Sequence, residues 1–267
     1  MTGLKLALNQ ATTKYWTLAE AIAGCRAAGI EGLGVWREPV AEVGLDTAAA
    51  MLADSGLTVT SLCRGGFFTG PDAAAENRRA VDEAAALGPT TLVLVCGGLP
   101  AGSRDLPAAR QAVADGLAAL VPYAADRGVR LAVEPLHPMF AADRSVVNTL
   151  AQALDLAEPY PADQVGVCVD TYHVWWDPDL AGQLRRAGER VFAYQVCDWV
   201  VPLPADMLLG RGHLGDGAID FGHVTDLVTA AGYTGFVEVE IFSAEVWDAP
   251  GDRTVATVVD RFRLIRR

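Results

Sequence analysis

The sequence is poor in positive charge and contains no long uninterrupted hydrophobic run. Lys and Arg number 21 against 33 Asp and Glu, which gives a formal net charge of −12 over 267 residues. A protein of this charge repels phosphate backbones and anionic membrane surfaces, so we expect neither nucleic acid nor a membrane as partner. The first apolar run ends at Asn9 and Gln10. It is too short for the core of an export signal or for a membrane span.

Cysteine pairs and phosphate-binding loops are also missing. The five cysteines are odd in number and widely spaced, and they include no CxxC pair. This usage favours reduced thiols in a cytoplasmic protein over a disulfide framework or a zinc knuckle. Neither a G-x-G-x-x-G loop after the first predicted strand nor a G-x-x-x-x-G-K-[ST] loop occurs. Disorder is excluded as well, because 51% of the residues are hydrophobic and only 20% are charged.

Short apolar runs alternate along the chain with longer Ala-rich stretches of helical period. The runs predict strands near Lys5–Asn9, Gly32–Val35, Thr58–Leu62, Thr91–Val95, Arg130–Val133, Val165–Val169, Phe192–Val196 and Val237–Glu240. The stretches predict helices near Thr17–Ala28, Leu45–Asp54, Asp72–Ala86, Pro107–Arg127, Ser145–Ala157, Pro178–Ala187, Phe221–Ala231 and Thr254–Arg266. Strands that are apolar throughout indicate a parallel sheet covered on both faces. Eight such units predict an α/β fold, a single (β/α)8 TIM barrel that occupies residues 1–267 as one domain.

Acidic residues stand at the ends of three predicted strands, where a barrel builds its active site. Glu134, Asp170 and Glu240 each follow apolar residues, and burial of a lone carboxylate is costly. Any one of them alone is more often a salt-bridged or loop residue than a metal ligand. Together they would repel one another, and a divalent cation resolves that conflict. Gln195 can add a carbonyl oxygen, so we expect one metal held by Glu134, Asp170, Gln195 and Glu240. The oxygen-rich set favours Mn²⁺, with Mg²⁺, Co²⁺ and Zn²⁺ as alternatives.

Histidines and cations follow the same strand ends. His137 stands three residues after Glu134, where it can move a proton near neutral pH. His173 stands three residues after Asp170, and Arg211 suits a substrate hydroxyl, carbonyl or carboxylate. For each cation the alternative is a salt bridge to the surplus acids, and for each aromatic residue it is a hydrophobic layer under the loops. The predicted substrate-binding set consists of Trp36, Arg37, Arg64, His173 and Arg211.

At these residues the sequence resembles the xylose-isomerase-like TIM-barrel superfamily of sugar isomerases and epimerases. The resemblance rests on VEPLHP at Glu134, VDTYHVWWD at Asp170, YQVCDW at Gln195, GRGHLGDGAIDF at Arg211 and GYTGFVEVEIF at Glu240. It implies the metal set named above, a proton shuttle by Glu134 and Glu240, and substrate binding by His173 and Arg211. Many relatives have His at the position of Gln195, so this chain departs from the family pattern there.

The resemblance implies a divalent-metal-dependent isomerase or epimerase of a small keto-sugar or keto-cyclitol. Such an enzyme abstracts an α-proton and passes through an enediolate. The alternative is a lyase at the same site, either a dehydratase or the catalytic subunit of a C-glycoside deglycosidase. A deglycosidase would act on a 3-keto-glycoside, use His137 as base and need a small partner subunit.

Two further hypotheses differ in class. DNA-repair endonucleases of the superfamily need a His-rich zinc cluster, which four histidines and a net charge of −12 disfavour. A non-catalytic binding barrel would keep the fold without the metal. For the enzyme we expect a small-molecule carbohydrate as partner, and a homo-oligomer is compatible because such barrels often pair.

Overall fold

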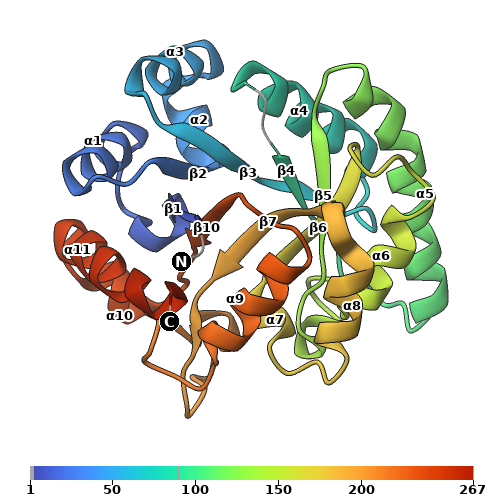
Figure 1. The fold of residues 1–267 in the computed structure, drawn as a ribbon. Helices are drawn as coiled ribbons and strands as arrows, with labels where there is room; N and C mark the ends of the chain where they lie inside the picture. Colours follow the sequence, from blue (N-terminus) through green and yellow to red (C-terminus); the bar gives the residue numbers. More distant parts are fainter. Residues whose placement is uncertain (1–2, 89–90, 267) are drawn as a thin grey trace.

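The computed structural model describes residues 3–88 and 91–266, and within them eight parallel strands close into a barrel (Figure 1). Around the barrel the strands follow the order β1, β10, β7, β6, β5, β4, β3 and β2, so the first strand pairs with the last. The predicted (β/α)8 barrel is confirmed. Its strands are β1 (Lys5–Asn9), β2 (Gly32–Trp36), β3 (Thr58–Gly66), β4 (Thr91–Val95), β5 (Arg130–Glu134), β6 (Val165–Asp170), β7 (Val191–Val196) and β10 (Phe236–Val239).

The helices lie outside the strands and cover the barrel (Figure 1). They are α1 (Leu18–Ala28), α2 (Arg37–Val43), α3 (Leu45–Ser55), α4 (Ala73–Ala86), α5 (Leu106–Ala125), α6 (Leu150–Ala157), α7 (Thr171–Val174), α8 (Leu180–Ala187), α9 (Phe221–Ala230), α10 (Ala244–Asp248) and α11 (Gly251–Arg261). The short helices α2, α7 and α10 were not predicted. The predicted helix start at Ser145 is wrong, because Thr149 caps α6 by accepting a hydrogen bond from the Gln152 amide.

Local signals explain where a typical helix begins and ends. Thr17 and Glu20 form a reciprocal capping box at the start of α1, which satisfies amide groups that the helix leaves unpaired. Gly29 ends α1 in the left-handed conformation with φ of 71°, which glycine adopts without steric cost. The chain then enters β2 at Gly32, a few residues after the end of α1.

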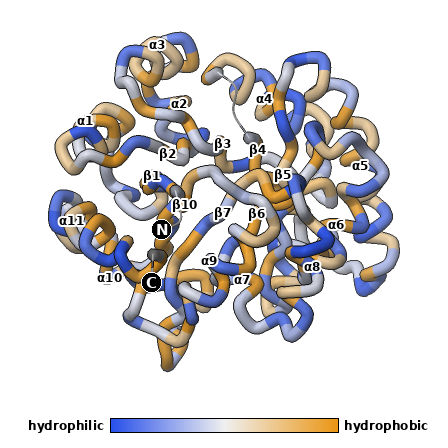
Figure 2. The backbone as a smooth tube through the Cα atoms, in the orientation of Figure 1, coloured by the Kyte–Doolittle hydropathy of each residue, from blue (hydrophilic) through white to orange (hydrophobic). Residues whose placement is uncertain are grey.

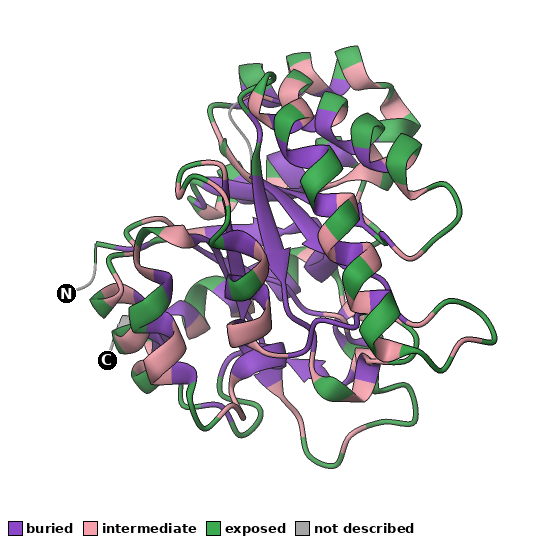
Figure 3. Ribbon diagram, turned by 90° about the vertical axis from the view of Figure 1, so that its right-hand side faces the viewer, coloured by how far each residue is buried: buried purple, intermediate pink, exposed green. Residues whose placement is uncertain are grey.

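The core has two parts, one between strands and helices and one inside the barrel. The strands are apolar and the outer faces of the helices hydrophilic (Figure 2), and burial follows the same division (Figure 3). The interior cluster consists of small and aromatic side chains from five strands, namely Cys63, Val93, Ala132, Cys168, Phe192 and Ala193. All five cysteines are free and buried, as predicted for reduced thiols. No helix within the described ranges is long and apolar enough to cross a membrane.

An antiparallel hairpin follows β7 and carries a cation to the mouth of the barrel. It pairs β8 (Asp198–Trp199) with β9 (Arg211–Gly212). The buried carboxylate of Asp198 accepts hydrogen bonds from the amides of Gly215, Gly217 and Ile219 at 2.8–3.0 Å. This single side chain therefore fixes both the hairpin and the loop after it, and with them the position of Arg211.

Candidate active site

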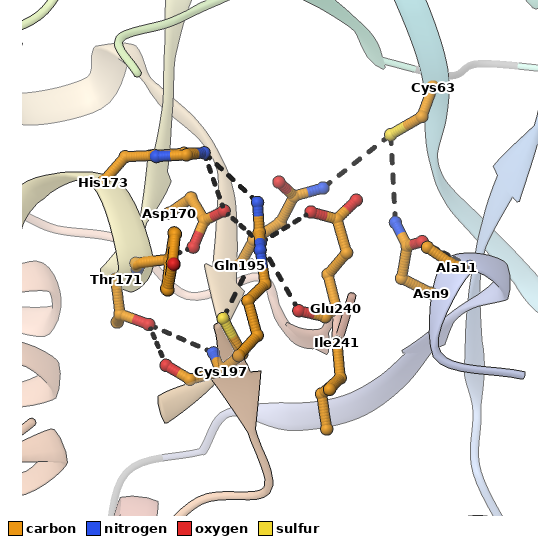
Figure 4. A network of polar contacts seen from close by, with 12 residues as sticks. Asn9, Ala11, Cys63, Asp170, Thr171, His173, Gln195, Cys197, Glu240 and Ile241 are labelled. Atoms are coloured by element: carbon orange, nitrogen blue, oxygen red, sulfur yellow. Dashed lines mark hydrogen bonds and ion pairs between the residues drawn. The ribbon is translucent and has the colours of Figure 1, made fainter. Parts of the chain in front are cut away.

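Three acidic side chains meet at the mouth of the barrel. Glu134 ends β5, Asp170 ends β6 and Glu240 directly follows β10, and their residues are only 5%, 0% and 4% exposed. Oxygen atoms of Glu134 and Asp170 and a ring nitrogen of His173 lie within 4.8 Å of one another. Figure 4 shows Asp170, His173 and Glu240 pointing toward a common centre. Of the sequence-predicted carboxylates, Glu134 and Asp170 therefore belong to one group of possible ligands with His173, whereas Glu240 lies outside this group and is joined to Asp170 through Arg211.

Arg211 lies among these carboxylates and binds two of them. Its Nη1 donates to Asp170 Oδ2 at 2.7 Å and to Glu240 Oε2 at 3.1 Å, and the side chain is 3% exposed. One buried guanidinium nitrogen is thus shared by two carboxylates, and burial strengthens each ion pair because water does not compete. The salt-bridge alternative stated for Arg211 thus holds in this structure, with the site's own acids as partners.

The electrostatics of the site favour protons or a cation. Burial, followed by the negative charges of Asp170 and Glu240, raises the pKa of Glu134 well above its ordinary value. Burial also raises the pKa of Asp170, against the opposing effect of Arg211, and it raises the pKa of Glu240 to about 8. Three carboxylates with one guanidinium leave two negative charges uncompensated when all are ionised.

Both ring nitrogens of His173 face hydrogen-bond donors. The backbone amide of His137 donates to Nδ1 at 3.1 Å, and Arg211 Nη2, which can only donate, lies 3.2 Å from Nε2. Burial, reinforced by the charge of Arg211, lowers the pKa of His173 well below its ordinary value. Its Nε2 also lies 3.7 Å from Asp170 Oδ2. His173 is therefore held between the His137 amide and the Arg211 guanidinium at the edge of the site.

His137 occupies the wall of the same mouth. Its Nδ1 accepts a hydrogen bond from the Met139 amide at 3.2 Å, and its ring lies 5.3 Å from Trp176 and 5.0 Å from Trp199. Burial lowers the pKa of His137. In the neutral ring Nε2 then carries the hydrogen, which is the geometry of a donor. The predicted role of His137 as a base requires the other tautomer and stays a prediction.

Gln195 is engaged inside the barrel. Its Nε2 donates to Glu238 Oε1 at 2.8 Å, and its Oε1 accepts from the Cys168 thiol at 3.3 Å. Glu238 also accepts hydrogen bonds from Asn9, Thr60 and Ser61. Because Glu238 can only accept, it orients the Gln195 amide with nitrogen toward itself and leaves the carbonyl oxygen to the other side. Metal ligation by Gln195 stays a prediction that this orientation permits.

The remaining predicted residues line the β2 and β3 side of the mouth. Arg37 is bound to Glu83 on α4, with Nε to Oε2 at 2.5 Å and Nη2 to Oε1 at 2.9 Å. Trp36 donates its indole N–H to Asn9 Oδ1 at 2.7 Å. Arg64 lies over the Trp36 ring. Arg37 is thus occupied by a salt bridge, whereas Trp36 and Arg64 form a platform at the rim.

The site fits a divalent cation by the chemistry of its donors. No side chain among the described residues donates a hydrogen bond to the carboxylate of Glu134, although the residue is only 5% exposed. Buried carboxylates ordinarily have such partners. The neighbouring oxygens of Glu134 and Asp170, with the nitrogen of His173 beside them and Glu240 joined through Arg211, are donors that hard and borderline divalent ions prefer.

A profile described as xylose isomerase-like TIM barrel matches residues 22–264 of this chain. The chain belongs to this family. Among curated members, 3-dehydroshikimate dehydratase from Pseudomonas aeruginosa is 34% identical over 180 residues, which are 65% of this chain and 26% of that protein. Inosose isomerase from Bacillus licheniformis is 29% identical over 134 residues, 49% of this chain and 46% of that protein. The matches thus span less than half the length of these curated relatives.

Two solved structures superpose over nearly the whole chain. The protein SMc04130 from Sinorhizobium meliloti 1021 is 50% identical, with a TM-score of 0.94 and 98% of both chains covered. The IOLI protein, solved with a zinc atom, is 22% identical, with a TM-score of 0.84 and 98% of both chains covered. The second likeness shows the shared fold.

Sequence reasoning about this family member missed the contacts that organise the site. The three acids were found because each follows an apolar strand. The double ion pair of Arg211 was not found, because it depends on a hairpin whose fold has no periodic signal. The network around Glu238 was also missed, although Asn9 at the end of β1 and Ser61 within β3 are polar residues in otherwise apolar runs. These polar residues within apolar strands were the sequence signal from which a buried polar network could have been predicted.

Proposed function

We propose that this protein is a divalent-metal-dependent isomerase or epimerase of a small keto-sugar or keto-cyclitol. The observation that carries the proposal is the carboxylate of Glu134. It is buried at the barrel mouth beside Asp170 and His173, and no described side chain donates a hydrogen bond to it. A carboxylate with a raised pKa and no partner suits removal of a proton from carbon near neutral pH.

Glu134, Asp170 and Glu240 would hold the cation, with the Gln195 carbonyl as the predicted fourth ligand. The bound ion would supply positive charge that polarises the substrate carbonyl and stabilises the enediolate. The zinc-containing IOLI structure supports a divalent ion for the shared fold. We expect Mn²⁺ here, because the donor set is rich in oxygen and lacks a thiolate.

The chain's own residues divide the chemistry between them. Glu134 takes the proton from the carbon next to the carbonyl, and Glu240, whose pKa is raised to about 8, can hold and return a proton. His173, whose Nε2 lies 3.2 Å from Arg211 Nη2, binds a substrate oxygen together with this guanidinium. The guanidinium of Arg211 stays bound to Asp170 and Glu240 and adds positive charge where negative charge develops. Return of the proton to the neighbouring carbon gives isomerisation, and return to the other face gives epimerisation.

A dehydratase is the second candidate, and one observation favours it. The relative with 34% identity is named 3-dehydroshikimate dehydratase. Dehydration begins with the same α-proton abstraction and ends with loss of a β-hydroxyl instead of proton return. The same residues can therefore serve both reactions, and only the fate of the substrate separates them.

The test is proton exchange in deuterated water. Metal-stripped protein, with and without added Mn²⁺, is incubated with an inosose, a ketopentose and 3-dehydroshikimate, and exchange at the α-carbon is followed by NMR. We expect exchange only with metal, and loss of it in Glu134→Gln. The exposed Glu42→Gln on α2 is the matched control. Exchange with recovery of sugar supports the isomerase, and release of water supports the dehydratase. Absence of both metal binding and exchange would refute the proposal.

A further inference from the structure

We propose that Arg64 makes this site selective for an anionic substrate, a small hydroxylated keto acid whose carboxylate binds the Arg64 guanidinium at the rim. The inference rests on the proposed function, because it assumes that the reacting carbonyl lies near Glu134. It adds the chemical class of the substrate and the residue that recognises it.

Arg64 lies close to the end of β3 that is level with Glu134. Gly66, two residues after Arg64, pairs with Val95 on β4, and Val95 pairs with Glu134 on β5, while Arg64 itself lies at the register shift before Gly65. Arg64 and Glu134 thus emerge from strands two apart at the same end of the barrel. The charge of Arg64 is also among the influences that lower the pKa of Glu134 and Glu240. A small molecule held at Glu134 would therefore lie within reach of Arg64.

Arg64 is held by aromatic rings on a fixed platform. The carbon at the centre of its guanidinium lies 5.5 Å from the centre of the Trp36 ring and 4.7 Å from that of the Phe67 ring. Trp36 is anchored by hydrogen bonds to Asn9 at 2.7 Å and Gln10 at 2.8 Å. Stacking on a ring holds the face of a guanidinium and leaves its N–H edge free. The platform therefore presents hydrogen-bond donors in a preorganised position.

Arg64 differs from the two other arginines of the mouth in having no counter-charge. Arg37 is neutralised by Glu83, and Arg211 is neutralised by Asp170 and Glu240. In the part of the chain that the structure describes, no carboxylate lies within 4.0 Å of the Arg64 guanidinium. A protein with a net charge of −12 has many acids available for pairing. An arginine left unpaired beside an active site indicates that its partner arrives with the ligand.

The surroundings favour a carboxylate over a phosphate. A cavity of about 300 Å³ is lined by Arg64 itself, by Arg37 and by the acids Glu38, Asp72 and Glu76. These acids repel any anion, but they repel a doubly charged phosphate more than a singly charged carboxylate, whose charge one free guanidinium balances. The planar fork of arginine also matches the two oxygens of a carboxylate. The geometry thus points to a keto acid.

The experiment measures binding and turnover separately. Calorimetry with the Mn²⁺-loaded protein compares shikimate with its methyl ester and gluconate with glucitol, four probes that lack the reacting carbonyl. We expect the wild type to bind at least one acid about 10- to 100-fold more tightly than its neutral counterpart. Arg64→Gln should abolish this ratio without changing the affinity for the neutral probe, and Arg64→Lys should keep part of it. Arg78→Gln, which removes an exposed arginine stacked on Tyr123, is the matched control.

The outcomes separate this inference from the proposed function. Equal binding of acid and neutral probe in both pairs overturns the role of Arg64, even if a neutral ketose is turned over. A ratio that survives in Arg64→Gln also overturns it. An Arg64-dependent preference for the acid without α-proton exchange in any keto substrate would support the binding site and refute the enzyme. Thermal unfolding of each variant shows whether a loss of binding comes from a loss of fold.

Discussion

Glu238 and Glu240 lie two residues apart in one segment, and we expect the same substitution to affect stability in opposite directions. Glu238 accepts hydrogen bonds from Asn9, Thr60, Ser61 and Gln195. Glu240 shares a single guanidinium with Asp170 and lies near other negative charges. In metal-free protein at pH 8, Glu238→Gln should destabilise the fold and Glu240→Gln should stabilise it.

The expected gain in the free energy of unfolding of Glu240→Gln follows from the pKa of Glu240, which burial raises from 4.5 to about 8. A carboxyl group with a raised pKa holds its proton in the folded state after the unfolded chain has lost it. Stability is therefore fully present below pH 4.5 and falls as the pH rises to about 8. At about 1.36 kcal/mol for each tenfold change in proton affinity, the loss reaches at most about 5 kcal/mol. Gln does not titrate, so Glu240→Gln should recover much of this free energy at pH 8 and little at pH 4.

The expected loss of stability in Glu238→Gln follows from the hydrogen bonds that the Glu238 carboxylate accepts. Replacement by Gln keeps one oxygen for Asn9 and Gln195, and the new amide can donate to the hydroxyls of Thr60 and Ser61. The bonds survive but lose the contribution of the charged acceptor, which is about 1 kcal/mol for each. With four donor residues, we expect Glu238→Gln to cost up to about 4 kcal/mol.

Urea unfolding at pH 5 and pH 8, with EDTA present, measures both effects. Addition of Mn²⁺ at pH 8 should raise the midpoint of the wild type and raise that of Glu240→Gln less, because the variant has lost a ligand. If Glu240→Gln is less stable than the wild type at pH 8 in EDTA, the electrostatic account of the site is wrong. Equal effects of the two substitutions would contradict the distinction between the two acids.

Two further predictions concern the elements that position the site. Asp198→Asn should lower the free energy of unfolding by about 2 kcal/mol and reduce kcat, because Asp198 binds the amides of Gly215, Gly217 and Ile219 and so fixes the hairpin that carries Arg211. Denaturant melts and steady-state rates measure this, and an unchanged kcat would show that the hairpin does not need this support. Gly34→Ala should cost about 1–3 kcal/mol, because the added carbon would lie 2.4 Å from Glu238 Oε1. Thermal unfolding beside Gly3→Ala, whose added carbon meets no neighbouring atom within 4 Å, decides whether the contact matters.

The fold was largely predictable because its strands are buried on both faces and its helices carry capping signals. β1 and β4 begin and end where the apolar runs do, and the other predicted strands are displaced by a few residues at most except at β3. β3 continues to Gly66, four residues beyond the predicted end at Leu62, because Cys63, Gly65 and Gly66 still pair with β4 around a register shift at Arg64. Hydrophobic periodicity does not detect strand pairing by glycine residues.

The site was predictable in its acids and less so in its contacts. Glu134, Asp170 and Glu240 were predicted because each follows apolar residues, a setting in which burial of an unpaired charge is costly. For Arg37 and Arg211 the sequence left both substrate binding and a salt bridge open, and the structure shows both bound to carboxylates, Arg37 to one on α4. Which acid an arginine binds depends on the distance between elements, and that distance arises only when the barrel closes. The same holds for the partners of Gln195.

Closure of the barrel gives this protein a late step in its biogenesis. Asn9 reaches Glu238 across 229 positions of sequence, and β1 pairs with β10, which is made last of the strands. Until the ribosome releases that segment, β1 has one unpaired edge and the side chain of Asn9 lacks its acceptor, Glu238. The polar interior is thus assembled by the same event that joins the two ends of the sheet. Non-local contacts of this kind slow folding. A chain that stops before residue 236 would lack both the seam and Glu240, so incomplete copies would be unable to form the site.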